Sequence, residues 1–336
     1  MPPENDERSP ERAKLEKQLE ASIRSALAHA PEKEHESTHA VTAIENNQPN
    51  KIIVLRRDLG ELLKKIHEKQ PKKHSEGGTV EELIVSIDST QEAVAEFLKI
   101  VEVSSVMNDM DSSIEIYKWL GNIFEQYHPK RKDGRVSNAD GDYFKFVGHE
   151  MFVSVIALYL REQRWGILEN LLTEAIPVKY LENENGAGSV YWHYASEHLP
   201  LLADESTKTR RLSVHADILD ARHTMGGLSA IMPMDEFTSA DFFLFILSEI
   251  PPVEYGRGVW KWRPWSVLFM KQAPLFIKNA EQGKYAQHLI DIFSVPDIEE
   301  FKKRLKERYA IVHNLFTGGF WHTPISDSDI DKIATR

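Results

Sequence analysis

Residues 142–162 read DYFKFVGHEMFVSVIALYLRE, a stretch that is apolar around most of a helical circumference. A surface helix carries one apolar stripe, whereas a helix that is apolar on most faces is enclosed by other elements. The run from Met151 to Leu160 is about half of what a membrane span requires. We therefore predict that residues 142–162 form the central buried helix of a folded body.

Helix signals continue on both sides of this segment. Thr79 with Glu82, Ser89 with Glu92, and Ser112 with Glu115 match the capping box that opens many helices. Alternating strand patterns with hairpin turns are scarce, and no fixed repeat emerges. The sequence predicts an irregular all-α domain of about ten helices. They are expected over residues 80–87, 90–107, 113–127, 142–162, 165–175, 190–198, 208–223, 235–249, 264–281, 284–294 and 297–316.

Aromatic residues are confined to the later part of the chain. The chain has 15 Phe, 10 Tyr and 7 Trp, and the first of them is Phe97. A segment without aromatics has little to bury and rarely forms a core of its own. We expect a charged arm over residues 1–75, helical or disordered, with an amphipathic stretch at 52–69. An all-α body over 79–325 would begin to fold near residue 80–90, and residues 326–336 would form a tail.

Charge divides the chain as well. The net charge is -11, yet residues 51–75 hold eight basic and three acidic side chains. This basic island can dock on the acidic body, on a partner protein or on nucleic-acid phosphate. A solvated helix or a self-docking arm is favoured, because no aromatic is interleaved for stacking on bases. The candidate binding residues in the island are Arg56, Arg57, Lys64 and Lys65.

Several kinds of chemistry are excluded. The chain has no cysteine, which rules out disulfides, zinc ribbons, iron–sulfur sites and thiol nucleophiles. P-loop, dinucleotide-glycine and nucleophile-elbow motifs are absent. His149 and Glu150 begin like a zincin helix, but position 153 is Val. The histidine and acid clusters at 193–198 and 215–223 do not converge on one helix face. We expect no metal and no cofactor.

The segment Tyr255 to Trp265, YGRGVWKWRPW, concentrates tryptophan and arginine. Exposed Trp and Arg together suit protein interfaces, cation–π contacts and stacking on bases. The alternative is that the tryptophans anchor a long loop onto the helical body. The candidate binding residues of this Trp-rich segment are Arg257, Trp260, Trp262, Arg263 and Trp265.

The last long helix contains Arg308 and His313 in the run RYAIVHN. This Arg-x4-His pair resembles the motif of HEPN-type proteins, helical bundles many of which are metal-independent RNases. The resemblance implies that His313 and Arg308 act on an RNA phosphodiester. Residues five apart do not converge on one helix, so catalysis would need a second copy of the helix across a dimer. The alternative is a paired core or interface arginine, because Arg308 falls within an apolar face that includes Phe301 and Leu305.

The body as a whole has a second, broader resemblance. The segments 142–172, 216–222 and 240–244, with Trp262-x-Pro264, look like helical regions that accompany effector domains in prokaryotic antiphage-defence proteins. We expect a non-enzymatic adaptor subunit of an intracellular complex, with a HEPN-type RNase as the alternative. Its partner would be another protein subunit or a second copy, with RNA possible. The first thirty residues are charged and give no secretory signal, so a cytoplasmic protein with no membrane contact is expected.

Overall fold

The structure is a computed structural model that describes Lys17, Ala21 and residues 38–71, 79–128, 141–178, 188–250, 261–315 and 325–336, with side chains in the last long helix up to Arg308. The all-α class is confirmed: the described residues hold fourteen α-helices and one two-stranded antiparallel pair. The helices are α2 (His39–Glu45), α3 (Lys51–Glu68), α4 (Val80–Asp88), α5 (Gln91–Val106), α6 (Met110–Phe124), α7 (Asp142–Arg161), α8 (Trp165–Thr173), α9 (Pro200–Thr209), α10 (Val214–Thr224), α11 (Met234–Glu249), α12 (Leu275–Asn279), α13 (Gly283–Phe293), α14 (Ile298–Leu315) and α15 (Asp327–Asp331). The strands are β1 (Ile176–Pro177) and β2 (Ser189–Val190), and the 3-10 helices are η2 (Trp192–Ser196) and η4 (Trp265–Phe269).

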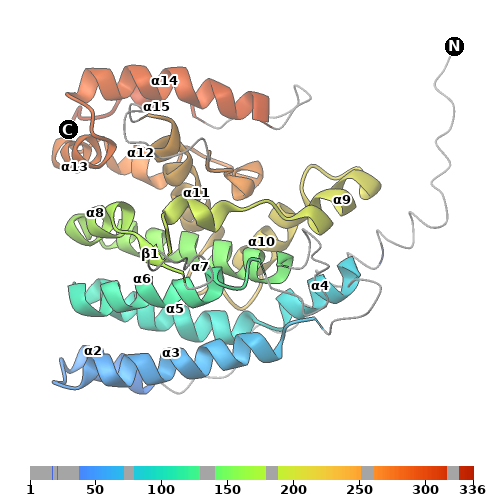
Figure 1. The fold of residues 1–336 in the computed structure, drawn as a ribbon. Coiled ribbons are helices and arrows are strands. Elements are labelled where there is room, and N and C mark those ends of the chain that lie inside the picture. The colour runs from blue at the N-terminus through green and yellow to red at the C-terminus, as the bar shows by residue number, and fades with distance from the viewer. Residues whose placement is uncertain are drawn as a thin grey trace, which may run out of the picture.

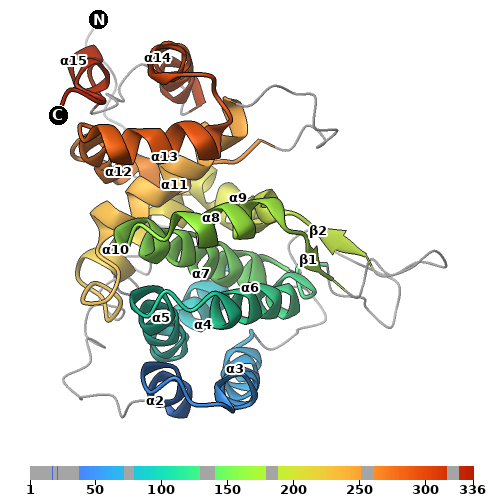
Figure 2. The same ribbon diagram turned by 90° about the vertical axis from the view of Figure 1, so that its left-hand side faces the viewer.

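The helices stack in layers that follow the chain (Figure 1). Helices α2 and α3 form the first layer and pack on α5 and α6, which in turn pack on α7. Helix α11 covers the other side of α7 and contacts α12 and α14, so that α12–α15 lie at the end opposite α2 (Figure 2). The layered order explains why one long helix in the middle has to be apolar all round.

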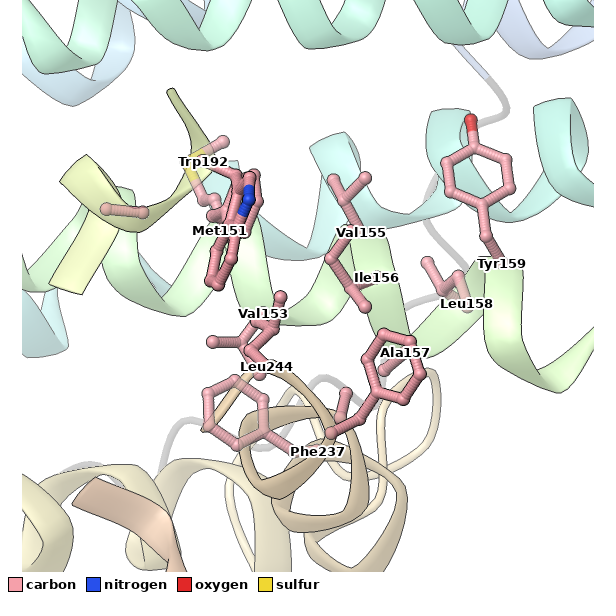
Figure 3. Close-up of a cluster of buried hydrophobic side chains, with 14 of the residues drawn as sticks. Met151, Val153, Val155, Ile156, Ala157, Leu158, Tyr159, Trp192, Phe237 and Leu244 are labelled. Atoms are coloured by element: carbon pink, nitrogen blue, oxygen red, sulfur yellow. The ribbon is translucent and has the colours of Figure 1, made fainter. Parts of the chain in front are cut away.

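Helix α7 is that central helix. Every residue from Asp142 to Leu160 is buried, and Figure 3 shows its side chains against those of neighbouring elements, Trp192 and Phe237 among them. Its length and composition would allow a membrane span, but the apolar window is entirely buried inside the protein. The prediction of a central buried helix at 142–162 is confirmed.

The expected start of the body near residue 80–90 is wrong. In α3 the side chains of Leu55, Leu59, Leu62 and Ile66 are fully buried, and Ile66 also accepts a hydrogen bond from the Tyr143 hydroxyl at 2.6 Å. Aliphatic side chains at helical spacing bury enough surface to join a core without any aromatic. Residues 39–68 therefore belong to the folded body rather than to an arm, and most of residues 1–37 lie outside the described part.

Two of the three predicted capping boxes are wrong. Thr79 and Glu82 do exchange both bonds at the start of α4. Ser89 instead donates to the Ser86 carbonyl, and α5 begins after Thr90. Helix α6 begins earlier than expected, with Asp109 accepting from the Ser112 backbone N–H. Aspartate is as good an N-cap as serine, so α6 begins after Asp109 rather than after Ser112.

One glycine is required by packing between α6 and β1. A Cβ atom on Gly121 would overlap the carbonyl oxygen of Pro177, which cannot move without shifting the strand. We expect Gly121→Ala to lower the free energy of unfolding by about 1–3 kcal/mol, the usual cost of overpacking. The control is Gly60→Ala in α3, where nothing lies within 4 Å and alanine should stabilise the helix by about 0.5–1 kcal/mol. Urea denaturation of both variants checks this, and equal effects would contradict it.

Candidate functional site

An ion pair lies in the middle of the body. The guanidinium of Arg222 on α10 donates to both carboxylate oxygens of Glu150 on α7, with Nε–Oε1 at 2.6 Å and Nη2–Oε2 at 2.8 Å. It also donates to the Ile87 carbonyl at 2.8 Å and to the Thr90 hydroxyl at 3.2 Å. Both charged side chains have no exposed surface. The pair therefore ties α7, α10 and the α4–α5 junction together.

The ion pair sets the protonation state of Glu150. Burial alone would raise the pKa of the carboxyl, but the charge of Arg222, the nearby ring of His223 and the hydrogen bonds from Arg222 outweigh it and lower the pKa to about 2. The Nε2 atom of His223 lies 3.3 Å from Glu150 Oε1. The other ring nitrogen of His223, Nδ1, lies 2.8 Å from the Met232 carbonyl oxygen. A carboxylate held in this way is a structural anion and a poor general base near neutral pH.

The low pKa of Glu150 predicts a pH dependence of stability. Because the folded-state pKa is depressed from 4.5 to about 2, the stabilisation is present above pH 4.5 and is lost as the pH falls towards 2. Glu150→Gln should be less stable than the wild type at pH 7, and the difference should shrink as the pH falls through this window. Urea midpoints at several pH values measure this, and a difference that stays constant with pH would contradict it.

A second carboxylate anchors the Trp-rich segment. Asp241 on α11 accepts hydrogen bonds from Trp262 Nε1 at 2.7 Å, from the Ser266 backbone N–H at 2.9 Å and from the Ser266 hydroxyl at 2.7 Å. Trp262 has no exposed surface and packs against His149 and Trp192. Its prediction as a surface binding residue is therefore wrong, because its indole is used to hold the segment to the core.

Two buried histidines lie beside this anchor. His149 and His215 pack edge to face at 5.0 Å between ring centroids, and none of their four ring nitrogens has a hydrogen-bond partner among the described residues. Burial, with His149 and His198 nearby, lowers the pKa of His215 well below its usual value, so its ring is neutral at pH 7. Oδ1 of Asp241 lies 3.7 Å from Nε2 of His149, too far for a hydrogen bond.

A pocket of about 250 Å³ reaches His215 from the surface. We call it the Arg263 pocket. Arg263 and Trp265 both line it, and the guanidinium carbon of Arg263 lies 5.8 Å from the centre of the Trp265 ring. Helix α9 and the start of α10 also line it. Its lining residues are His198, Leu199, Leu202, Ala203, Ser206, Thr207, Arg211, Leu212, Ser213, His215, Arg263 and Trp265. Two predicted binding residues, Arg263 and Trp265, thus share one concave site.

A larger pocket of about 380 Å³ lies at the C-terminal end of α10, where His223 and Thr224 line it. It reaches His223 and Thr238, and the hydroxyl of Thr238 has no hydrogen-bond partner among the described residues. Lys271 lies exposed in its lining, and seven apolar or proline residues share the wall with carboxylate and hydroxyl groups. Its mixed lining does not select one class of ligand.

The basic island is largely neutralised by the protein itself. Arg56 binds Glu115 bidentately at 2.7 Å, and Lys65 contacts Glu96. Lys64 and Arg57 pair with Glu61 and Asp58 on their own helix. These four side chains remain more than half exposed, so the pairs contribute little to stability. Arg56 and Lys65 join α3 to α6 and α5, whereas Lys64 and Arg57 pair within α3.

Of the remaining predicted site residues, Arg308 has a described side chain. Arg308 lies half-exposed on α14 with Nη1 3.9 Å from Glu249 Oε2, while Phe301 and Leu305 are buried as expected. The side chain of His313 and residues Arg257 and Trp260 lie outside the described part. Within the described ranges, no three histidine, aspartate or glutamate residues could hold a metal ion.

Comparison of the chain with protein-family profiles, with curated proteins and with solved structures found no match.

Sequence reasoning missed the groups that organise this site, namely Glu150, Arg222 and Asp241. The available signal was a charged residue inside an otherwise apolar helix, as Glu150 is within 142–162 and Asp241 is within ADFFLF. A charge in such a position needs a buried partner. The identity of that partner depends on which helices pack together, and no local pattern specifies it.

Proposed function

We propose that this chain is a non-enzymatic helical interaction protein, an adaptor subunit whose contact surface is centred on Arg263 and Trp265. Its partner is another protein subunit or a second copy of the chain. Because its helical segments resemble those of prokaryotic antiphage-defence proteins, we propose that the complex is cytoplasmic and acts in bacterial antiphage defence.

The observation that carries this proposal is the split within the Trp-rich segment. Trp262 is buried and bonded to Asp241, whereas its neighbour Arg263 is exposed. The Arg263 backbone is itself held by a hydrogen bond from its N–H to the Ser196 hydroxyl at 2.9 Å. An arginine on an anchored backbone beside a tryptophan loses little entropy on binding, and Trp and Arg are frequent binding hot spots.

The buried ionisable groups support a binding role over catalysis. Glu150 is held as an anion by Arg222 and His223, and Asp241 already accepts three hydrogen bonds. A catalytic acid or base needs a pKa near the working pH and access to substrate. In the described core, Glu150 instead joins α7 to α10, and Asp241 joins α11 to Trp262 and Ser266.

Site-specific photocrosslinking tests the contact surface. A photoreactive amino acid is placed at position 263, or at position 271 as a control, because Lys271 is also an exposed cation but lines the other pocket. In cells that express the chain at its natural level, we expect a discrete crosslinked species from position 263 and none from 271. Equal crosslinking from both positions, or none from 263, would contradict the proposed surface.

The alternative is a metal-independent RNase that uses Arg308 and His313. One observation favours it: the Arg308 side chain is 42% exposed, so a phosphate could reach it. RNA cleavage by the purified chain in EDTA decides this alternative, with Arg308→Ala and His313→Ala as variants. Cleavage that both substitutions abolish would replace the adaptor proposal, whereas cleavage unchanged by either, or none at all, would exclude this RNase.

A further inference from the structure

We propose that the Arg263 pocket binds a small phosphorylated molecule, with its phosphoryl group held between Arg263, His215 and Trp265. The inference goes beyond the proposed function and does not rest on it, because the ligand would bind the isolated chain.

The first support is a pair of unused polar groups in the pocket lining. His215 is 3% exposed, and both of its ring nitrogens lack a hydrogen-bond partner in the described structure. The indole Nε1 of Trp265 is likewise buried and unpartnered there. Burying a polar group without a hydrogen bond destabilises the folded state. Two such groups lining one pocket indicate a site that an incoming ligand completes.

The chemistry of these groups selects the ligand. The indole N–H and the guanidinium can only donate hydrogen bonds, and a neutral imidazole donates from one nitrogen. The ligand must therefore present several acceptor oxygens in different directions. A tetrahedral phosphoryl group does so, and arginine binds it with charge-assisted, bidentate hydrogen bonds.

The charges around the pocket favour an anion. Burial lowers the pKa of His198, and the positive charges of Arg263 and Lys145 lower it further, while Asp204 acts in the opposite direction. The other charges nearby are largely paired: Arg211 contacts Asp217 at 2.8 Å and Lys145 lies 3.3 Å from Glu197. Arg263, by contrast, has no carboxylate within ion-pair distance among the described residues.

The start of α10 adds to this field. Helix α10 begins at Val214, and its N-cap Ser213 lines the pocket. The capping bonds run from the Ala216 N–H to Ser213 and from the Val214 N–H to the Ser206 hydroxyl. The N-terminal end of α10, where the helix dipole is positive, is thus part of the pocket lining.

The apolar lining residues of the pocket would contact the organic part of the ligand. Leu199, Leu202, Ala203 and Leu212 line the pocket on the α9 side, and Leu212 is 68% exposed at its rim. A volume of about 250 Å³ exceeds the need of inorganic phosphate and suits a small ester with an organic part. We expect a phosphate monoester to bind more tightly than phosphate alone.

Two-dimensional ¹H–¹⁵N NMR of the isolated chain tests the site directly. The Trp265 indole signal, assigned with Trp265→Phe, should shift saturably with inorganic phosphate at constant ionic strength, and glycerol phosphate should bind more tightly. Arg263→Gln and His215→Phe should each weaken binding at least tenfold. The matched control Lys271→Gln, which removes one exposed cation at the other pocket, should bind like the wild type.

Several outcomes would overturn the inference. They are the absence of a saturable shift at Trp265, equal affinity for acetate and phosphate, or unchanged affinity in Arg263→Gln, a surface substitution that leaves the core intact. A phosphoserine peptide that binds more tightly than glycerol phosphate would replace the small molecule with a protein-borne phosphoryl group. Since no partner is present in this experiment, its failure leaves the crosslinking test of the proposed function unaffected.

Discussion

Replacing Arg222 with methionine is expected to lower the free energy of unfolding by about 3–5 kcal/mol, the cost of breaking a buried ion pair by removing one partner. The substitution leaves the Glu150 carboxylate without its two guanidinium hydrogen bonds, and the Thr90 hydroxyl and Ile87 carbonyl also lose a donor. Urea denaturation followed by circular dichroism measures the change. A loss below about 1 kcal/mol would contradict the structural role assigned to the pair.

The control for Arg222→Met is Arg56→Met. Arg56 also binds a carboxylate bidentately, but its side chain is 64% exposed. Solvent screens such a pair, so we expect a far smaller effect than at Arg222. In addition, the double substitution Arg222→Met with Glu150→Leu should recover much of the lost stability, because it removes both charges. Without such recovery, the loss in Arg222→Met would reflect packing rather than an unpaired carboxylate.

Deletion of residues 1–75 is expected to abolish cooperative folding. It removes four fully buried aliphatic side chains of α3, namely Leu55, Leu59, Leu62 and Ile66, and uncovers α5 and α6. At about 1.5–3 kcal/mol for each side chain, the loss is comparable to the whole stability of a typical domain, about 5–15 kcal/mol. Thermal unfolding followed by circular dichroism should show no sharp transition.

The matched truncation removes residues 1–37 alone. This deletion ends before α2 and takes away none of the buried α2 or α3 side chains. We expect its melting temperature to match that of the full chain. If the deletion of 1–75 also melts like the full chain, α2 and α3 do not belong to the body.

The features that the sequence predicted well are those that depend on local pattern. A segment apolar on all sides has one stable environment, so α7 and its burial could be read from residues 142–162 alone. Phe301 and Leu305 on α14 follow the same logic. The absence of aromatics before Phe97 led to the wrong domain boundary, because aliphatic residues at helical spacing bury surface just as well.

The site depended on packing that local pattern does not contain. Trp262 and Arg263 are neighbours in a sequence rich in both residue types, yet one is fully buried and the other exposed. The difference is made by Asp241, which lies more than twenty residues earlier and accepts the indole hydrogen bond. His215 likewise enters the site only because α9, α10 and η4 meet at one pocket.

The most direct test of the adaptor proposal is the mass of the assembly, measured by native mass spectrometry on the tagged chain purified from cells that express it at its natural level. We predict that the wild type and Lys271→Glu are recovered in a discrete complex, with a second protein or a second copy of the chain. Arg263→Glu, which reverses the charge at the proposed contact surface, should be recovered as the free tagged chain. A wild-type chain recovered as a monomer, or an Arg263→Glu complex of unchanged mass and abundance, would contradict the proposal.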